Sequence, residues 1–372
     1  METKPHSVLH IIRMESAGGG TMAPLRLAQA EMAAGRRARV FCVIERQFDV
    51  VSANAAECGV RVNRMKIPRL MLELLKTRML GSRLDVVHMH SGLNHISPKV
   101  RLVRRLLAAR IPLIVWLHGP GDLERMEDPK AIEEHQEGSR SAAVVVVPSE
   151  AERRRQVQLG IPPEKLFAIP IIIQVSKAQR GLARGRLGLD ADAPILLFCG
   201  RLAEEKNPLT ACRAFRQILQ QYPRAALIIA GDGPLADACK KEVEGLGGRV
   251  HFLGHVANTG ELYADADILL APSSAESFGM SALEAAYAKV PVVLGRIRPW
   301  CEMLRDGAEC EFVDPESPAE MSAAILRLLG DRKRAAAMAE AAYEVVQRTC
   351  TAEAVRASLD KMYSHIWNAR RP

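Results

Sequence analysis

Hydrophobic residues gather into short continuous runs along the chain, separated by stretches with helical spacing or polar composition. Short apolar runs bounded by turn residues are typical of strands buried on both faces of a parallel sheet. In the first half they lie at residues 8–13, 39–44, 86–90, 113–117 and 143–147. In the second half they lie at 195–199, 226–230, 250–253, 268–271 and 291–294. The pattern therefore predicts a parallel sheet in each half.

Helical segments connect these strands. Residues 22–34 have helical spacing and end at Gly35, a residue suited to a helix C-terminus, and helices are also expected at 208–221, 281–288 and over most of 320–369. The alternation predicts an α/β fold of two Rossmann-like, doubly wound domains facing each other across a cleft. We expect an N-terminal domain at 1–175 and a C-terminal domain at 176–354, opened by a polar connection at 176–193. A final helix at 355–372 is expected to pack back on the N-terminal domain.

Composition narrows the class of protein. Of the 372 residues, 48% are hydrophobic and 25% are charged, as in globular proteins. No apolar run is long enough to span a bilayer, and the amino terminus lacks a secretory pattern. The eight cysteines form no C-x-x-C pair. We therefore expect a cytoplasmic protein with reduced thiols.

Positive charge is concentrated in one part of the chain. The net charge is +8, and residues 61–110 hold twelve Lys or Arg against two acidic residues. Such a block predicts an anionic partner. Within it, 97–110 has the spacing of an amphipathic helix with Arg101, Arg104 and Arg105 on its polar face. Because aromatic residues make up only 4% of the chain, we expect a membrane surface and no nucleic acid. A helix that merely covers the sheet is the alternative.

A glycine-rich loop follows the first strand. Gly18 to Ala23 satisfies the G-x-G-x-x-A pattern of dinucleotide-binding proteins, and Glu45 ends the second strand, where that pattern has an acid. The glycines begin several residues after the strand, however, which disfavours a nicotinamide site. We expect instead that the backbone at Gly19 and Gly20 approaches a phosphate or sugar at a helix N-terminus, or forms an ordinary turn.

Two motifs of the second half carry candidate chemistry. Arg201 and Lys206 follow Gly200 at a strand end, where two cations could clamp a diphosphate and stabilise it as a leaving group without a metal. Further on, Glu276 is expected to project from a loop, and Glu284, in the following helix, to accept hydrogen bonds from a ribose diol. The backbone N–H groups of residues 277–279 could bind a phosphate there. A solvated basic turn and two unrelated surface glutamates are the alternatives.

Residues from about 195 to 315 resemble family 4 of the retaining glycosyltransferases, which have the two-domain GT-B fold. The segments carrying the resemblance are Gly200-Arg201-Leu202, Glu205-Lys206-Asn207, Gly231-Asp232-Gly233-Pro234, Val250, Phe252-Leu253-Gly254, Ala271-Pro272-Ser273, Glu276-Ser277-Phe278-Gly279, Glu284-Ala285, Pro291-Val292-Val293 and Glu302. The N-terminal half resembles the family less closely, through the Gly18–Gly20 loop and Leu117-His118-Gly119.

The resemblance implies a role for each candidate residue. Arg201 and Lys206 would hold the donor diphosphate and Glu284 the ribose. Glu276 would bind hydroxyls of the transferred sugar, and His118 would contact that sugar near the anomeric carbon. The leaving phosphate would assist a front-face substitution that retains anomeric configuration. The donor-binding set is Gly19, Gly20, Gly200, Arg201, Lys206, Gly231, Val250, Ser277, Phe278, Gly279, Leu283 and Glu284, and the catalytic set is His118, Arg201, Lys206 and Glu276.

Two segments depart from the family pattern. Ile-Ile-Ile-Gln at 171–174 stands where many relatives have Asn-Gly, and 295–301 replaces a glycine-rich turn, so the donor sugar stays open. The Asp-x-Asp strings at 190–192 and 265–267 are interpreted as structural. His88 and His90 show no ligand spacing and are interpreted as packing or cleft residues. We expect neither a metal nor another cofactor.

The sequence thus predicts a metal-independent, retaining hexosyltransferase. It would move a sugar from a nucleotide-sugar, UDP-sugar ahead of GDP-mannose, to a glycan or lipid-linked acceptor. Lipopolysaccharide or exopolysaccharide synthesis at the inner face of the membrane is the expected setting. The alternatives are a nucleotide-sugar epimerase of the same fold, a non-catalytic nucleotide-sugar-binding protein and, last, a nicotinamide oxidoreductase.

Overall fold

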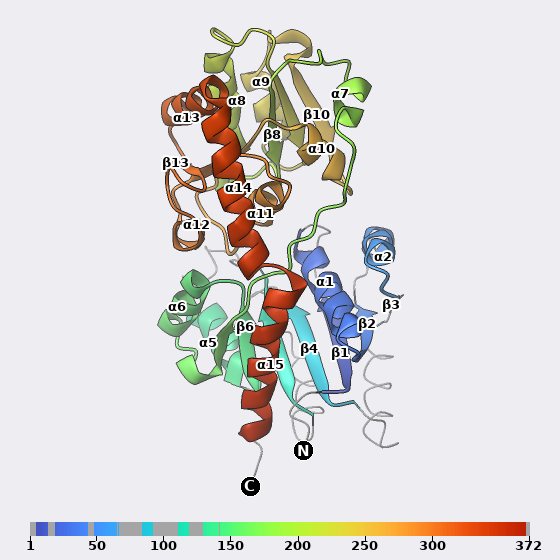
Figure 1. Ribbon diagram of the computed structural model, residues 1–372. Helices are drawn as coiled ribbons and strands as arrows, with labels where there is room; N and C mark the ends of the chain where they lie inside the picture. Colours follow the sequence, from blue (N-terminus) through green and yellow to red (C-terminus); the bar gives the residue numbers. More distant parts are fainter. Residues whose placement is uncertain are drawn as a thin grey trace. The chain divides into compact units, whose positions relative to one another are not determined.

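The computed structural model describes residues 5–13, 19–43, 48–64, 66, 84–91, 111–118, 129–140 and 142–369. Contacts divide the chain into two compact units (Figure 1). The N-terminal unit comprises Met1–Ile172 together with Ala352–Pro372, and the C-terminal unit comprises Ile173–Thr351. The chain therefore leaves its first unit once and returns to it with its last helix.

The described strands of the N-terminal unit form a parallel sheet in the order β3-β2-β1-β4-β5-β6-β7. The strands are β1 (Ser7–Arg13), β2 (Arg37–Cys42), β3 (Val62–Arg64), β4 (Val86–Ser91), β5 (Leu113–Leu117), β6 (Val144–Val147) and β7 (Leu166–Ala168). The helices are α1 (Gly19–Ala33), α2 (Phe48–Glu57), α5 (Pro129–Arg140), α6 (Glu150–Gln158) and the 3-10 turn η2 (Pro163–Lys165).

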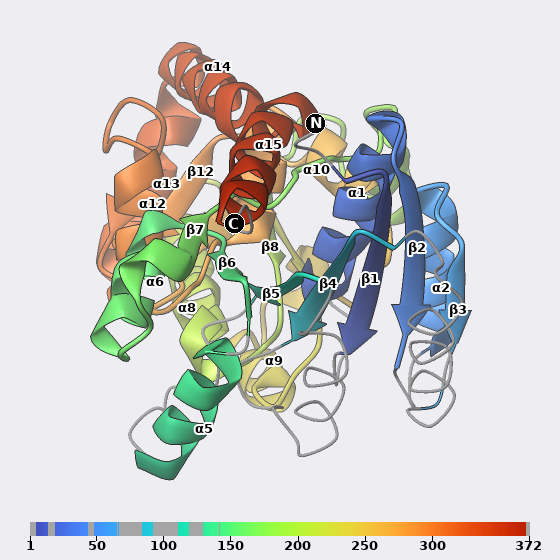
Figure 2. The ribbon, with the colours of Figure 1, turned by 90° about the horizontal axis from the view of Figure 1, so that it is seen from below.

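The two faces of this sheet differ in chemistry. One face buries aliphatic residues such as Leu9, Val87 and Val115 in a purely apolar cluster. The opposite face packs against α1 and against α15 (Ala352–Asn368), whose Tyr363 is fully buried among strand residues. Figures 1 and 2 show these two helices lying side by side on the sheet. The C-terminal helix is thus part of the core of the N-terminal unit.

The C-terminal unit has a parallel sheet in the order β10-β9-β8-β11-β12-β13. Its strands are β8 (Ile195–Cys199), β9 (Ala226–Ala230), β10 (Val250–Gly254), β11 (Ile268–Ala271), β12 (Val292–Gly295) and β13 (Glu311–Val313). Its helices are α7 (Leu182–Arg186), α8 (Pro208–Ile218), α9 (Ala236–Glu242), α10 (Gly260–Asp265), α11 (Met280–Tyr287), α12 (Arg298–Met303), α13 (Pro318–Gly330) and α14 (Arg332–Thr349), with 3-10 turns η3 (Glu204–Lys206) and η4 (Gly247–Arg249).

Helices cover both faces of this second sheet. Residues of α8, α9 and α13 form the cluster on one face, and residues of α10, α11 and α12 form the cluster on the other. All strands of both sheets are parallel within the described residues, which explains why most of them were recognisable as continuous apolar runs. Among the described residues, no helix is long and apolar enough to cross a bilayer.

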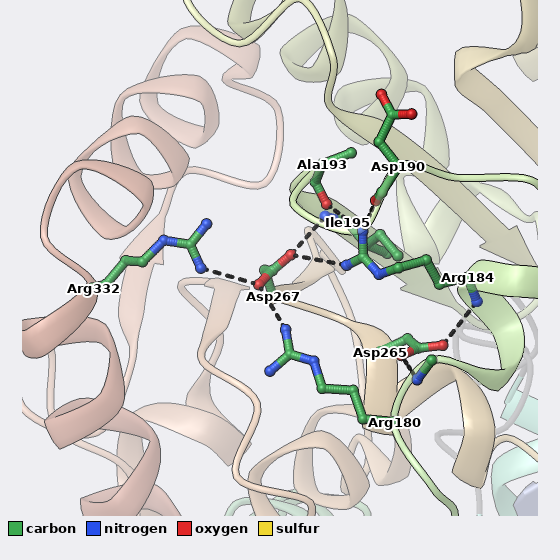
Figure 3. A network of polar contacts seen from close by, with 9 residues as sticks. Arg180, Arg184, Asp190, Ala193, Ile195, Asp265, Asp267 and Arg332 are labelled. Atoms are coloured by element: carbon green, nitrogen blue, oxygen red, sulfur yellow. Dashed lines mark hydrogen bonds and ion pairs between the residues drawn. The ribbon is translucent and has the colours of Figure 1, made fainter.

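The stretch at 176–193, predicted as a polar connection at the start of the C-terminal domain, folds into the C-terminal unit and contains a short helix. It contains α7, in which Ala183 is fully buried. The Asp265 carboxylate accepts hydrogen bonds from the backbone N–H groups of Gly181 (2.5 Å) and Arg184 (2.8 Å), which satisfies the start of that helix (Figure 3). The Arg184 guanidinium donates to the carbonyl of Ala193 at 2.8 Å. The many arginine and glycine residues suggested a linker here, but Arg184 is buried and hydrogen-bonded.

The second Asp-x-Asp string has a structural role, as the sequence analysis proposed. Asp267 accepts a hydrogen bond from the backbone N–H of Ile195 at 2.8 Å, which joins it to β8. Its other oxygen lies 3.5 Å from a guanidinium nitrogen of Arg180 and 3.5 Å from one of Arg332 (Figure 3). In the first string, Asp192 forms an exposed pair with Arg224. These carboxylates are engaged by protein groups.

Candidate functional site

The motifs of the C-terminal unit meet at the edge of the sheet where its strands end. Gly200 follows β8, Gly231 follows β9, and the segment that leads to Glu276 follows β11. Because the strands are parallel, their carboxyl ends share one edge, and the segments leaving them become neighbours. Ligands of doubly wound sheets bind beyond this edge.

Gly231 allows the first two loops to touch. Its φ is +151°, and a Cβ atom at this position would lie 1.8 Å from the carbonyl oxygen of Gly200. The backbone N–H of Gly200 donates to the carbonyl of Ala230 at 2.9 Å, and that of Leu202 donates to the carbonyl of Asp232 at 3.0 Å. The loop that carries Arg201 is therefore fixed against the end of β9 by its backbone.

An ion pair joins the two charged motifs. The Lys206 ammonium contacts the Glu276 carboxylate, whose same oxygen, Oε1, also accepts from the Ser273 hydroxyl at 3.1 Å. The Lys206 and Glu276 side chains are 24% and 10% exposed. Below them, the backbone N–H of Ser274 donates to the carbonyl of Glu205 at 2.9 Å. Residues 70 positions apart are thus brought together.

Arg201 lies in the same loop as Lys206 but is exposed, and within the described ranges it makes no ion pair. The site therefore presents one cation already paired with a carboxylate and one exposed cation that has no ion pair among the described residues. An anionic ligand at this edge would gain a guanidinium at once, and it would gain the Lys206 ammonium by taking the place of Glu276.

The second glutamate of the motif is held by a tyrosine that the sequence analysis missed. Gly279, at φ +79°, turns the chain into α11, and Glu284 is half-buried on that helix. The Tyr263 hydroxyl lies 3.3 Å from Glu284 Oε2 and also 3.3 Å from the carbonyl oxygen of Ser281, so its one proton is shared between these two acceptors. Burial raises the pKa of Tyr263 well above its ordinary value, so the hydroxyl keeps its proton. No local pattern links α10 to α11, which is why Tyr263 could be found only in three dimensions.

Not every predicted donor-binding residue can offer a side chain. Ser277, Phe278 and Leu283 are 5%, 1% and 0% exposed, so only backbone atoms of the 277–279 turn are candidates for a ligand. Val250 begins β10 and packs against the hydrophobic core, whereas the other motifs follow the carboxyl ends of their strands. The prediction for Val250 does not fit this placement, because a five-residue strand separates it from the site edge by roughly 13 Å.

The loop at 295–301, which departs from the family pattern, reaches the same motif. Trp300 is fully buried, and a Cβ atom on Gly279 would lie 2.2 Å from its Nε1. The unusual loop thus packs against the turn between Glu276 and Glu284.

The predicted residues of the N-terminal unit also follow strand ends. His118 comes directly after β5 and is half-buried, and burial lowers its pKa to about 4. Gly19 and Gly20 are the first residues of α1, which follows β1. Gly18, Arg101, Arg104 and Arg105 lie outside the described residues, so their predictions are untested.

A cluster of histidines lies behind His118, and the sequence analysis did not foresee it. His10, His88 and His90 are fully buried, and a nitrogen atom of each lies within 4.8 Å of the others. His90 Nδ1 is 2.8 Å from His118 Nε2, so the cluster reaches the candidate catalytic residue. Because His10 lies in β1, His88 and His90 lie in β4 and His118 follows β5, their spacing along the chain gave no sign of a cluster.

The fold and the site edges define a class of protein before any comparison is made. Two Rossmann-like parallel sheets in one chain, with candidate ligand-binding residues at strand ends, are the GT-B arrangement. The family of glycosyl transferases group 1 matches residues 179–345, and the glycosyl transferase 4-like domain matches residues 18–171. The chain belongs to these glycosyltransferases, and the resemblance predicted from its motifs is confirmed.

Individual relatives agree with this assignment. The chain is 28% identical over 374 residues to an alpha-D-kanosaminyltransferase of Streptomyces kanamyceticus, which covers 90% of this chain and 92% of the relative. It is 34% identical over 204 residues to a D-inositol 3-phosphate glycosyltransferase of Acidothermus cellulolyticus, covering 50% and 45% of the two chains.

Solved structures confirm the fold. The HepE protein of Anabaena, solved in complex with UDP and glucose, superposes with a TM-score of 0.79 at 19% identity, over 96% of this chain and 99% of that one. At this level of identity the likeness establishes the GT-B fold.

Proposed function

We propose that the protein is a retaining, metal-independent glycosyltransferase that moves a sugar from a UDP-sugar to a glycolipid or polysaccharide acceptor. The observation that carries the proposal is the pairing of Lys206 with Glu276 beside the exposed Arg201, at the edge where Glu284 also lies. A donor of this class supplies what these groups lack: a diphosphate for the cations, and hydroxyls for the carboxylates.

The reaction follows from these roles. Arg201 and Lys206 hold the diphosphate and stabilise the negative charge that grows on it as the bond to the anomeric carbon breaks. The acceptor oxygen forms its bond on the same face of the sugar and gives its proton to the leaving phosphate. Glu276 and Glu284 orient the sugar and the ribose. Because the cations stabilise the leaving group, the transfer is expected to proceed in EDTA, and a strict metal requirement would contradict the proposal.

UDP is the favoured nucleotide because the HepE structure holds UDP and glucose and a pneumococcal O-GlcNAc transferase of the same fold was solved with UDP and GlcNAc. The nucleotide is tested by calorimetry with UDP, GDP and ADP. A preference for GDP would move the donor to GDP-mannose, and failure of every nucleotide to bind would remove the proposal.

Two substitutions separate binding from transfer. Lys206→Ala should weaken UDP binding by roughly 10- to 100-fold, because a hydrogen bond to a charged group is worth about 1.5–3 kcal/mol. Glu276→Gln should leave UDP affinity equal or higher, since it frees Lys206, while it removes transfer of the sugar. Lys240→Ala, at an exposed surface pair with Asp237, is the matched control and should change neither. Unchanged UDP affinity in Lys206→Ala would contradict the phosphate assignment.

We propose further that the acceptor is lipid-linked, as in lipopolysaccharide or exopolysaccharide synthesis, and that the protein binds the inner face of the membrane. The twelve basic residues at 61–110 support this, because each contributes about 1 kcal/mol near an anionic leaflet. Reversing Arg101, Arg104 and Arg105 to Glu should reduce sedimentation with anionic vesicles. Equal sedimentation of the variant and the native chain would contradict the membrane proposal and leave the donor site untouched.

A further inference from the structure

The polar layer under α1 and α15 contains two hydrogen-bonded chains, and each passes through one histidine of β4. In the first, which we call the His118 chain, His10 Nδ1 lies 3.0 Å from His90 Nε2, and His90 Nδ1 lies 2.8 Å from His118 Nε2. The ring planes are within 18° and 16° of each other, with centroids 5.3 and 5.1 Å apart. Each centroid distance exceeds the corresponding N···N distance by about the width of one ring, so the rings lie edge to edge. Each N–H therefore points along the lone pair of the next ring.

The second chain, which we call the Tyr363 chain, fixes His88. Trp116 Nε1 lies 2.8 Å from His88 Nδ1, and an indole nitrogen can only donate, so His88 Nδ1 must be the acceptor. His88 therefore carries its proton on Nε2, 2.9 Å from the Tyr363 hydroxyl, which donates in turn to Glu31 at 2.6 Å. Arg36 pairs with the other oxygen of Glu31 at 2.5 Å.

The Tyr363 chain argues against a metal in the histidine cluster. A metal held by His10, His88 and His90 needs a lone pair from each, and the only lone pair of neutral His88 already accepts from Trp116. The two remaining histidines bond to each other. The cluster is therefore explained by hydrogen bonds alone.

The His118 chain has a direction. Its three rings are uncharged near neutral pH, because burial lowers the pKa of His10 to about 3 and that of His90 well below its ordinary value. Within the described residues His10 Nε2 has no hydrogen-bond partner. If His118 donated to His90 and His90 to His10, His10 Nε2 would be a buried N–H group without an acceptor. If His10 donates to His90 and His90 to His118, His10 Nε2 carries only an unused lone pair. Buried N–H groups without partners are the rarer case, so each ring donates outward from Nδ1.

We propose that His10 and His90 are positioning residues that hold His118 as its Nδ1–H tautomer. His118 then acts in sugar transfer as a neutral hydrogen-bond donor, and its Nε2 lone pair is occupied by His90. The part played in transfer rests on the proposed function, whereas the tautomer does not. A donor is the group that a sugar oxygen near the anomeric carbon requires, and a basic imidazole there would compete with the leaving phosphate for the acceptor proton.

The test is nitrogen NMR on the full chain labelled at its ten histidines, with ring tautomers read from two-bond couplings at pH 7.5. We expect Nδ1–H for His10, His90 and His118 and Nε2–H for His88. In His90→Phe, which keeps a flat buried ring without nitrogens, no donor occupies His118 Nε2, so the Nε2–H form is no longer excluded and His118 should show both tautomers. The kcat for transfer should fall by at least about 10-fold with little change in the donor KM.

Tyr363→Phe is the matched control, because it breaks the neighbouring chain at the same depth. It should leave His118 on Nδ1–H and keep kcat. His10→Asn retains an amide donor toward His90 and should keep His118 on Nδ1–H. It provides a second variant of the His118 chain if His90→Phe fails to fold. Nε2–H at His118 in the native chain, or stoichiometric zinc binding lost in His10→Asn, would overturn the proposal. UDP calorimetry reports the donor site separately, so failure of one conclusion is distinguishable from failure of the other.

Discussion

Acid should destabilise the N-terminal unit through its three fully buried histidines, His10, His88 and His90. Their pKa values are lowered by burial from the ordinary 6.5, so they stay neutral in the folded state while the unfolded chain takes up protons. The unfolded state then binds more protons, and stability is complete above about pH 6.5 and falls as the pH is lowered. Integrated from pH 7.5 to 5, each neutral histidine costs about 2 kcal/mol, or about 6 kcal/mol for the three.

A loss of that size matches much of the stability of an ordinary domain, about 5–15 kcal/mol. Two buried acids act in the opposite sense. Burial raises the pKa values of Glu31 and Glu152, so the folded state takes up their protons first and recovers part of the loss as the pH falls. A single substitution isolates one histidine from these offsets. His10→Asn removes one titrating ring, and the change in its free energy of unfolding between pH 7.5 and 5 should be smaller by about 2 kcal/mol.

The assay is urea unfolding followed by tryptophan fluorescence. Of the three tryptophans, Trp116 and Trp367 lie in the N-terminal unit and Trp300 lies in the other, so a Trp300→Phe background reports the N-terminal transition alone. Comparing changes between two pH values cancels whatever His10→Asn costs at neutral pH. If native chain and variant lose stability equally between pH 7.5 and 5, His10 is not held neutral in the fold, and the reasoning fails.

Three further predictions concern stability measured by urea unfolding at pH 7.5. Gly279→Ala should cost about 3 kcal/mol, because a Cβ atom would meet Trp300 in addition to the strain of φ +79°, whereas Gly307→Ala, at φ +73° with open space, should cost only about 1 kcal/mol. Asp265→Asn should cost about 1–3 kcal/mol, since one of the two backbone N–H groups bound by the carboxylate loses its acceptor; no loss would mean that the contacts to α7 are not formed. Tyr363→Phe should cost about 1–3 kcal/mol, because Glu31 loses a hydrogen-bond donor and His88 Nε2–H loses its acceptor. A variant as stable as the native protein would contradict the hydrogen bonds of the Tyr363 chain.

The architecture was predictable because both sheets are parallel and covered on both sides. Each central strand is a continuous apolar run whatever its loops contain, and the order of runs and helices implied two doubly wound sheets. The strands β3 and β13 were missed for the opposite reason. Each has three residues, lies at the edge of its sheet and carries polar residues such as Asn63 or Glu311, so neither has the length or the apolar composition of a buried strand.

The candidate site was predictable where one motif contains both partners in a short segment. Glu276 and Glu284 fall in one loop and the helix after it, and the positive φ of Gly279 fixes their relation locally. The contacts of Tyr263 and Trp300 with that motif depend on which helices share a face of the sheet, and sequence spacing carries no such information. The same limit hid the buried Arg184 behind a composition typical of linkers.

The histidine layer shows what a sequence can disclose once strand order is known. His88 and His90 are two residues apart in β4, so both point to one face, and the register sets His10 beside His88 and Trp116 beside His90. Polar residues that alternate within strands buried on both faces must find partners inside the protein. The two histidines of β4 resolve this differently: His88 bonds toward α15, and His90 bonds toward His118 at the strand edge. His88 and His90 are both fully buried histidines of β4, but their substitution should have different effects. His88 variants should mainly lose stability, and His90 variants should mainly lose turnover.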